Sequence, residues 1–361
     1  MIVFLSSSAR SRYADDIIRM LALPHGGQMQ FRYSAKWLAD DVRAQVPRGE
    51  LAGELALICY VADSSAADPY GLVPVRFARI IRAEQVGTSY ILTLAADAFA
   101  ANVSDTDLRS AMTIADRSRL PSAAGAANEL YGMAADFDPR PHKRRSFDAF
   151  ETTAQSLSRY ASFATEQTAF FSVRHISEVS GRSWFGTWPA PNRIDRGAFM
   201  LRTGKRYECE VYCLRFFEKQ PDLQGVKLPP EELTLVAEAN DDSLQFASTT
   251  RSVIDSRYDV KRFIFAEEPE VLRRVSGFRL FLSAAGDIDG QARQDISLQM
   301  VFGGSILMAA VRALSIGIAT AGPAMIAANA SNKLYPGTAI VMIALGILAG
   351  IAAIFPSFRK P

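Results

Sequence analysis

Two arginine-bearing stretches carry the residue types most suited to binding chemistry in the first half of this chain. In the first, PVRFARIIRAEQ, Arg76, Arg79 and Arg82 recur along an expected strand and its edge. Guanidinium groups bind phosphates and carboxylates, so one interpretation is an anion-binding face. The other is a solvated strand surface, because a spacing of three cannot place all the arginines on one face of a strand.

The second stretch, residues 138–150 (DPRPHKRRSFDAF), is the densest basic cluster in the sequence. Such clusters attract anionic lipid headgroups or nucleic-acid phosphates. The alternative is a solvated interdomain loop, which the neighbouring prolines favour. The basic residues that would bind are Arg140, Lys143, Arg144 and Arg145.

A third stretch, residues 182–196 (RSWFGTWPAPNRIDR), places Trp184 and Trp188 among arginines. Aromatic rings beside arginines stack on bases, dock partner proteins or lie at a membrane interface. A tryptophan that plugs the core, with turn residues around it, is the alternative. We therefore treat these residues as a candidate ligand or partner site.

Catalytic and metal-binding patterns are missing from the sequence. It contains no phosphate-binding GxxxxGK[ST] loop, no GxSxG elbow, no HExxH and no CxxC pair. Cys209 and Cys213 would lie about 13 Å apart on a strand that rises ~3.3 Å per residue, too far for a disulfide or for joint metal ligation. We expect no enzymatic activity, no metal and no cofactor.

The last sixty residues differ in composition from the rest of the chain. Residues 300–330 and 338–355 are apolar runs whose only charge is Arg312. Because a helix of roughly 20 apolar residues crosses a bilayer, we predict a transmembrane helical hairpin over residues 300–361. Arg312 would mark the cytoplasmic boundary or line a polar pathway. The alternative, a buried helical pair, predicts polar residues at a helical period, and residues 338–355 have none.

Small residues in both runs would let the helices approach closely, so we expect a homo-oligomer. The candidate interface residues are Gly317 and Gly322 in the first run and Gly346 and Gly350 in the second.

The apolar patterns ahead of the hairpin predict an α+β multidomain chain. Residues 1–100 mix short strands with two helices and indicate a small α/β, barrel-like domain. Residues 101–167 read as a helical linker. Residues 168–299 alternate apolar with polar residues between turns, typical of an immunoglobulin-like β-sandwich. A net charge of +2 does not by itself indicate a nucleic-acid partner.

This arrangement of soluble domains followed by two apolar helices resembles that of bacterial anti-phage effectors. The resemblance implies an inner-membrane protein whose soluble domains sense a trigger, after which the chain oligomerises and perturbs the bilayer. The start of the sequence is not a signal peptide, so we expect the domains and both termini in the cytoplasm. The trigger would be a partner protein, a nucleic acid or a nucleotide. The alternative is an adaptor whose β domain binds a partner while the hairpin only anchors it.

Overall fold

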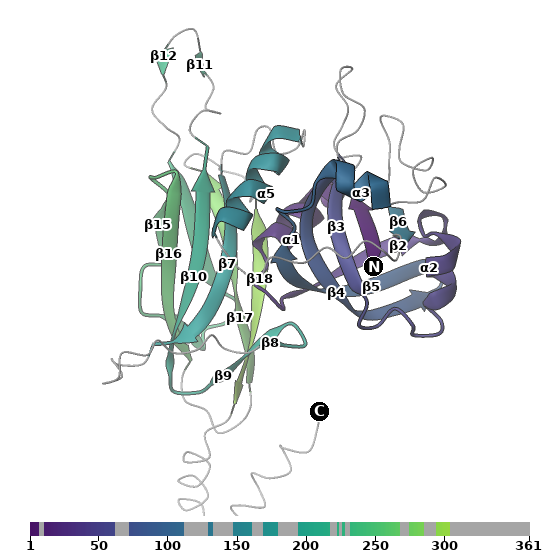
Figure 1. The fold of residues 1–361 in the computed structure, drawn as a ribbon. Coiled ribbons are helices and arrows are strands. Elements are labelled where there is room, and N and C mark those ends of the chain that lie inside the picture. Colours follow the sequence, from purple (N-terminus) through teal and green to yellow (C-terminus); the bar gives the residue numbers. More distant parts are fainter. Residues whose placement is uncertain are drawn as a thin grey trace, which may run out of the picture.

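The computed structural model describes most of the first 303 residues, and most of these form β-sheets (Figure 1). The described residues form two six-stranded sheets, one four-stranded sheet and a short pair, β11 (Asp222–Leu223) with β12 (Val226–Lys227). The described ranges are 1–6, 11–61, 72–111, 129–132, 147–160, 169–179, 194–216, 222–223, 226–227, 232–267, 274–284 and 294–303.

The N-terminal domain is built on one mixed sheet of six strands in the order β2-β5-β4-β3-β1-β6. Among the described strands of this sheet, only the neighbours β1 and β3 run parallel. The strands are β1 (Ile2–Ser6), β2 (Gln28–Ser34), β3 (Leu55–Val61), β4 (Leu72–Val86), β5 (Ser89–Phe99) and β6 (Glu129–Gly132). The helices are α1 (Ser11–Ala22), the 3₁₀ turn η1 (Ala35–Trp37), α2 (Asp40–Gln45) and α3 (Asp105–Ala111).

Strand β3 shows why this sheet is covered on both faces. Its sequence, LALICYV, is apolar at every position, as expected for a central strand with no solvated side. Ile58 and Tyr60 belong to the apolar core that α1 joins, whereas Leu57 and Cys59 belong to a second core that α3 joins. The described strands form a single row from β2 to β6, so the domain is an open mixed sheet rather than the expected barrel.

The second domain is a two-layered β-sandwich. One layer has the order β14-β16-β10-β7, and the other has β15-β13-β17-β18-β9-β8. Alternate residues such as Val211, Phe263 and Phe278 point inward and form one shared core. The strands are β7 (Ala169–Glu178), β8 (Ile194–Asp195), β9 (Ala198–Arg202), β10 (Arg206–Arg215), β13 (Leu233–Ala239), β14 (Leu244–Phe246), β15 (Arg251–Val253), β16 (Tyr258–Glu267), β17 (Arg274–Ala284) and β18 (Asp295–Gly303).

Helix α5 (Phe147–Tyr160) lies between the two domains (Figure 1). On one side the Phe150 ring packs against Phe99 of β5, with ring centroids 5.7 Å apart. On the other side Phe147 meets Tyr212 of β10 edge to face at 5.1 Å. One continuous apolar core therefore includes the N-terminal sheet, α5 and the start of the sandwich.

Gln294, directly before β18, makes a second connection between the domains. Its amide is buried and accepts a hydrogen bond from the Phe171 N–H (2.7 Å) while donating to the Phe171 carbonyl (3.0 Å). The same NH₂ group donates to the carbonyl of Ile18 in α1 at 3.2 Å. The side chain thus pairs with β7 as a neighbouring strand would and ties that strand to the N-terminal domain.

The predicted α+β fold class with a C-terminal transmembrane hairpin is wrong, because the described residues form mostly β-sheet with few helices. Residues 300–303 do not begin a helix, because they complete β18 between β17 and β9. Among the described residues, no helix combines the length and the apolar character needed to cross a bilayer. This finding contradicts the predicted transmembrane hairpin and the predicted inner-membrane location. Residues 304–361, the rest of that predicted hairpin, lie outside the described residues.

Residues 35–46, whose apolar residues recur at a helical period, do not form one continuous helix. Leu38 has an extended backbone with φ −110° and ψ 133°, which separates η1 from α2. Leu38 and Val42 are both buried in the same core. Burial of Leu38 in an extended conformation thus outweighs the helical period that the sequence displays.

Replacing Gln294 tests the connection between β7 and α1. We expect Gln294→Leu to lower the free energy of unfolding by about 2–4 kcal/mol, because it leaves the buried N–H and C=O of Phe171 without this partner and removes the bond to the Ile18 carbonyl. Gln299→Leu, at an exposed position of β18, is the matched control and should change it by less than ~0.5 kcal/mol. Urea denaturation measures both, and equal effects would contradict the role of Gln294.

Candidate functional site

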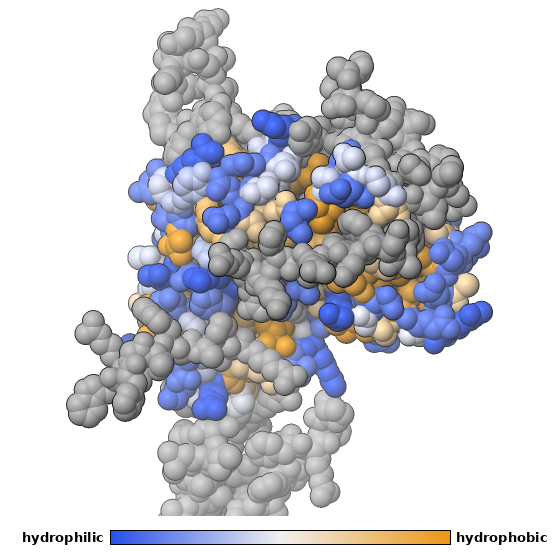
Figure 2. All heavy atoms as spheres, viewed as in Figure 1, coloured by the Kyte–Doolittle hydropathy of each residue, from blue (hydrophilic) through white to orange (hydrophobic). Residues whose placement is uncertain are grey.

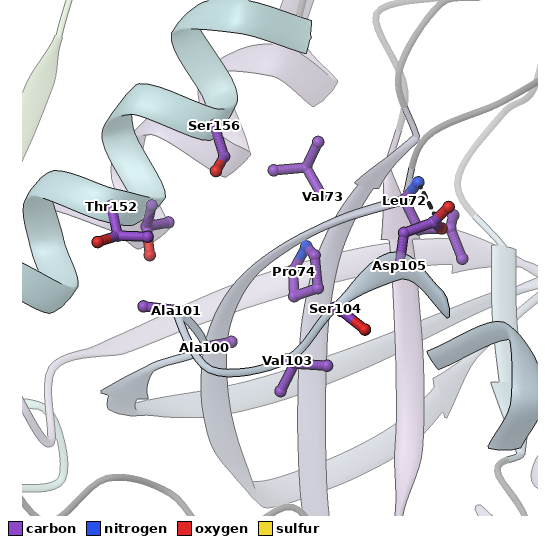
Figure 3. Close-up of a pocket in the computed structure, with 11 residues that line it drawn as sticks. Leu72, Val73, Pro74, Ala100, Ala101, Val103, Ser104, Asp105, Thr152 and Ser156 are labelled. Carbon is purple, nitrogen blue, oxygen red and sulfur yellow. Dashed lines mark hydrogen bonds between the residues drawn. The ribbon is translucent and has the colours of Figure 1, made fainter. Parts of the chain in front are cut away.

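A pocket of about 300 Å³ lies beside α5, where that helix faces the N-terminal sheet. Its walls come from the start of β4, from the segment between β5 and α3, and from α5 (Figure 3). The volume lies at the lower end of the range for small-molecule sites. The lining residues are Leu72, Val73, Pro74, Ala100, Ala101, Val103, Ser104, Asp105, Thr152, Thr153 and Ser156.

The β5–α3 segment is held in place by side-chain hydrogen bonds. The Ser104 hydroxyl accepts from the Asp107 N–H at 3.0 Å and donates to the Asp107 carboxylate at 2.6 Å, which caps the first turn of α3. Asp105 accepts a hydrogen bond from the backbone N–H of Leu72 at 3.0 Å, drawn as a dashed line in Figure 3. That bond fastens α3 to the start of β4, so both walls are fixed to the sheet.

Helix α5 contributes hydroxyl groups to the other wall. Thr152 donates to the carbonyl of Asp148 (2.8 Å), and the buried Thr153 donates to that of Ala149 (2.9 Å). Both threonine hydroxyls therefore donate their proton within the helix, and their oxygen lone pairs remain as acceptors. Asp105 is the one residue with a formal charge among the described lining residues. The pocket thus suits a small molecule that donates hydrogen bonds, either neutral or cationic.

The structure separates the three arginines that the sequence singled out on β4. Arg76 is buried, and its guanidinium donates to the carbonyls of Met20 (3.0 Å) and Leu23 (2.5 Å) at the end of α1. Its Nε donates to the carbonyl of Asp97 at 2.8 Å. A cation at a helix C-terminus is favourable because the last carbonyls carry partial negative charge. Arg76 therefore holds α1 on the sheet and does not face solvent.

Arg79 and Arg82 are exposed, and each has a local contact. Arg79 donates to the carbonyl of Gly53 at 3.0 Å, and Arg82 forms an ion pair with Glu84 at 2.6 Å. Neither residue lines the pocket. The three arginines are thus not brought together into one anion-binding face.

The other predicted site residues lie outside the described residues. These are Arg140, Lys143, Arg144, Arg145, Trp184, Trp188, Arg312, Gly317, Gly322, Gly346 and Gly350.

Metal and thiol chemistry have no candidate site in the described part of the chain. No group of three or more His, Cys, Asp or Glu side chains there could hold a metal ion. The three cysteines are buried, and burial raises the pKa of each thiol, which disfavours the reactive thiolate.

Sequence reasoning singled out none of the pocket residues. The one available signal was the Ser104-Asp105-Thr106-Asp107 run, whose spacing is typical of a helix start. That signal predicts α3 but says nothing of the wall that α5 supplies from about fifty positions further along. Only the packing of α5 against the sheet brings the two walls together.

Comparisons with known proteins give no family for this chain. No family model and no curated protein matches it. Among the solved structures, the chain is similar to the periplasmic chaperone SfaE at 9% identity and a TM-score of 0.20. That match covers 30% of this chain and 56% of the chaperone chain, and it is too weak to indicate a shared fold.

Arg76 gives a test of its structural role. We expect Arg76→Met to lower the free energy of unfolding by about 2–4 kcal/mol, because the α1 carbonyls and Asp97 lose a charged donor inside the core. Arg82→Met should stay within about 0.5 kcal/mol, since its ion pair is exposed. Denaturant unfolding of both variants measures this. If Arg76→Met is as stable as the wild-type protein, this structural role is contradicted and Arg76 is again a candidate for ligand binding.

Proposed function

We propose that this protein is a sensor in which the pocket binds a small molecule and α5 relays its presence to the β-sandwich. The supporting observation is that this one helix both lines the pocket and contacts the sandwich. Thr152, Thr153 and Ser156 of α5 line the pocket. Phe147 and Glu151 of the same helix contact the sandwich.

The sandwich end of this relay is a set of contacts around Tyr258, the first residue of β16. The Phe147 ring packs against Tyr258 at 5.4 Å and against Tyr212 at 5.1 Å. The Tyr258 hydroxyl donates to the Glu151 carboxylate at 2.5 Å. Glu151 precedes the pocket residue Thr152 directly in the chain. A ligand that shifts α5 would therefore move these aromatic contacts.

The lining limits the chemical class of the ligand. Its walls combine apolar side chains with hydroxyl and carboxylate oxygens, and the carboxylate of Asp105 disfavours anions. We therefore favour a compact amine, polyol or nucleoside over a phosphorylated compound. The membrane anchoring expected from the sequence is not part of this proposal. Homo-oligomerisation and a nucleotide trigger stay predictions.

A pocket-filling substitution tests the ligand site. A thermal-shift screen of amines, polyols and nucleosides should yield compounds that raise the melting temperature of the wild-type protein. We expect Ala101→Trp to abolish these shifts, because the indole occupies the pocket. Ala52→Trp, at an exposed turn, is the matched control and should keep them. Shifts that persist in Ala101→Trp would place the ligand elsewhere.

Amide hydrogen exchange with the same compounds tests the relay separately. A bound compound should change amide hydrogen exchange in β16 of the wild-type protein. In Phe147→Ala the compound should still bind but leave exchange in β16 unchanged. If a compound binds the wild-type protein without changing exchange in β16, the pocket remains a ligand site and the relay is contradicted.

A further inference from the structure

The outer face of the four-stranded layer of the sandwich carries a cluster of arginines and aromatic residues. We call it the arginine–aromatic patch and define it as Arg174, Tyr212, Tyr258, Val260 and Arg262. None of the five lines the pocket described above. Figure 2, which shows this face over β10 and β16, has a mostly hydrophilic surface broken by small hydrophobic spots.

Strand register brings these side chains together. Tyr212 of β10 lies directly opposite Val260 of β16, and Glu210 lies opposite Arg262. Directly opposite residues in antiparallel strands share one face of the sheet. The Arg174 guanidinium from β7 lies over the Tyr212 ring, 5.5 Å from its centroid. The patch thus spans three adjacent strands.

On this face the carboxylate of Glu210 is buried, and the two arginines that pair with it are exposed. Glu210 forms ion pairs with both Arg174 and Arg262, yet its side chain is only 8% exposed. The two arginine side chains are 44% and 60% exposed. Burial would raise the pKa of the Glu210 carboxyl, but the hydrogen bond from Arg174 and the nearby positive charges hold it below its usual value. Glu210 therefore stays ionised at neutral pH and fixes the arginines from beneath.

The arginines keep donors for a further partner. A guanidinium carries five N–H donors in a planar fork. The contacts of Arg262 to Glu210 and Glu208 use Nε, and Arg174 reaches Glu210 through one terminal nitrogen. Terminal N–H groups in such a fork match the two oxygens of a carboxylate.

Exposed apolar surface accompanies these cations. Tyr258 is 47% exposed and Val260 is 42% exposed, both on β16. Aromatic side chains and arginines are the residue types enriched at protein–protein interfaces. An occupant of this face would therefore combine negative charge with an apolar anchor.

We propose that the arginine–aromatic patch docks an acidic segment of a partner protein, one with carboxylates flanking an aliphatic or aromatic residue. A nucleic acid fits this face less well. The patch has two cations, and the carboxylate of Glu208 lies 3.5 Å from one of them, Arg262, so this face offers no continuous row of positive charge to the phosphates. This surface goes beyond the proposed sensor function, because it would bind a second protein and no pocket residue belongs to it. It shares Tyr212 and Tyr258 with the contacts of α5, which cover part of both rings.

Selection from a display library of random 12-residue peptides on the full chain tests this proposal. We expect the selected peptides to be rich in Asp and Glu with an apolar residue between them. Val260→Glu and Arg262→Gln should each weaken their binding tenfold or more, as for residues at the centre of an interface. The matched controls are Val86→Glu and Arg82→Gln, exposed positions of the N-terminal domain that should leave affinity unchanged. Fluorescence anisotropy measures each affinity.

Other outcomes overturn the proposal. Failure to select peptides, selection of basic peptides, or affinities that the patch variants and the control variants change equally would each contradict it. A labelled oligo-dT strand is the competing probe. If that strand binds more tightly than the selected peptides and loses affinity in Val260→Glu and Arg262→Gln, the face is a nucleic-acid site instead. Thermal unfolding of Arg262→Gln, which also loses its contact to Glu210, verifies that this variant is folded.

Discussion

Helix α5 packs against two different sheets, and this shared burial determines how the two domains are joined. Phe150, Ala154 and Leu157 lie in one core with the N-terminal strands and with Phe170 and Leu214 of the sandwich. Full burial of a large apolar side chain stabilises by about 1.5–3 kcal/mol, so Phe150 and Leu157 hold α5 firmly in this core. The pocket exists because one stretch of α5 presents small hydroxyl residues to the sheet instead of large apolar ones.

Polar groups fix the geometry that apolar burial leaves undetermined. Gln294 bonds both backbone groups of Phe171 and a carbonyl of α1, and Arg76 bonds the last carbonyls of that helix. Hydrophobic contact is non-directional, whereas each of these bonds requires one position of α1 relative to β4 and β7. The two side chains come from distant parts of the sequence, and both act on backbone groups of α1.

Much of the strand content could be predicted from the sequence, because period-two alternation is a local signal. Residues 207–215 alternate in this way and lie within β10, whereas the continuous apolar run of residues 55–61 has the length of a buried strand and is β3. The C-terminal end was misjudged because Met300, Val301 and Phe302 are all apolar, a run that fits a buried strand as well as a helix. Sequence pattern could not reveal that Arg76 is buried, since its partners are carbonyls, which every residue has. Nor could it find the pocket, whose walls meet only through tertiary packing.

Through its contacts with both sheets, α5 should make the two domains one cooperative unit. Native-state hydrogen exchange on the full chain tests this directly, by comparing opening free energies in β3, in α5 and in β10. We expect the most protected amides of all three to exchange with one common free energy and one common denaturant dependence. A sandwich that opens at a lower free energy while β3 stays protected would contradict it, as would separate opening of α5.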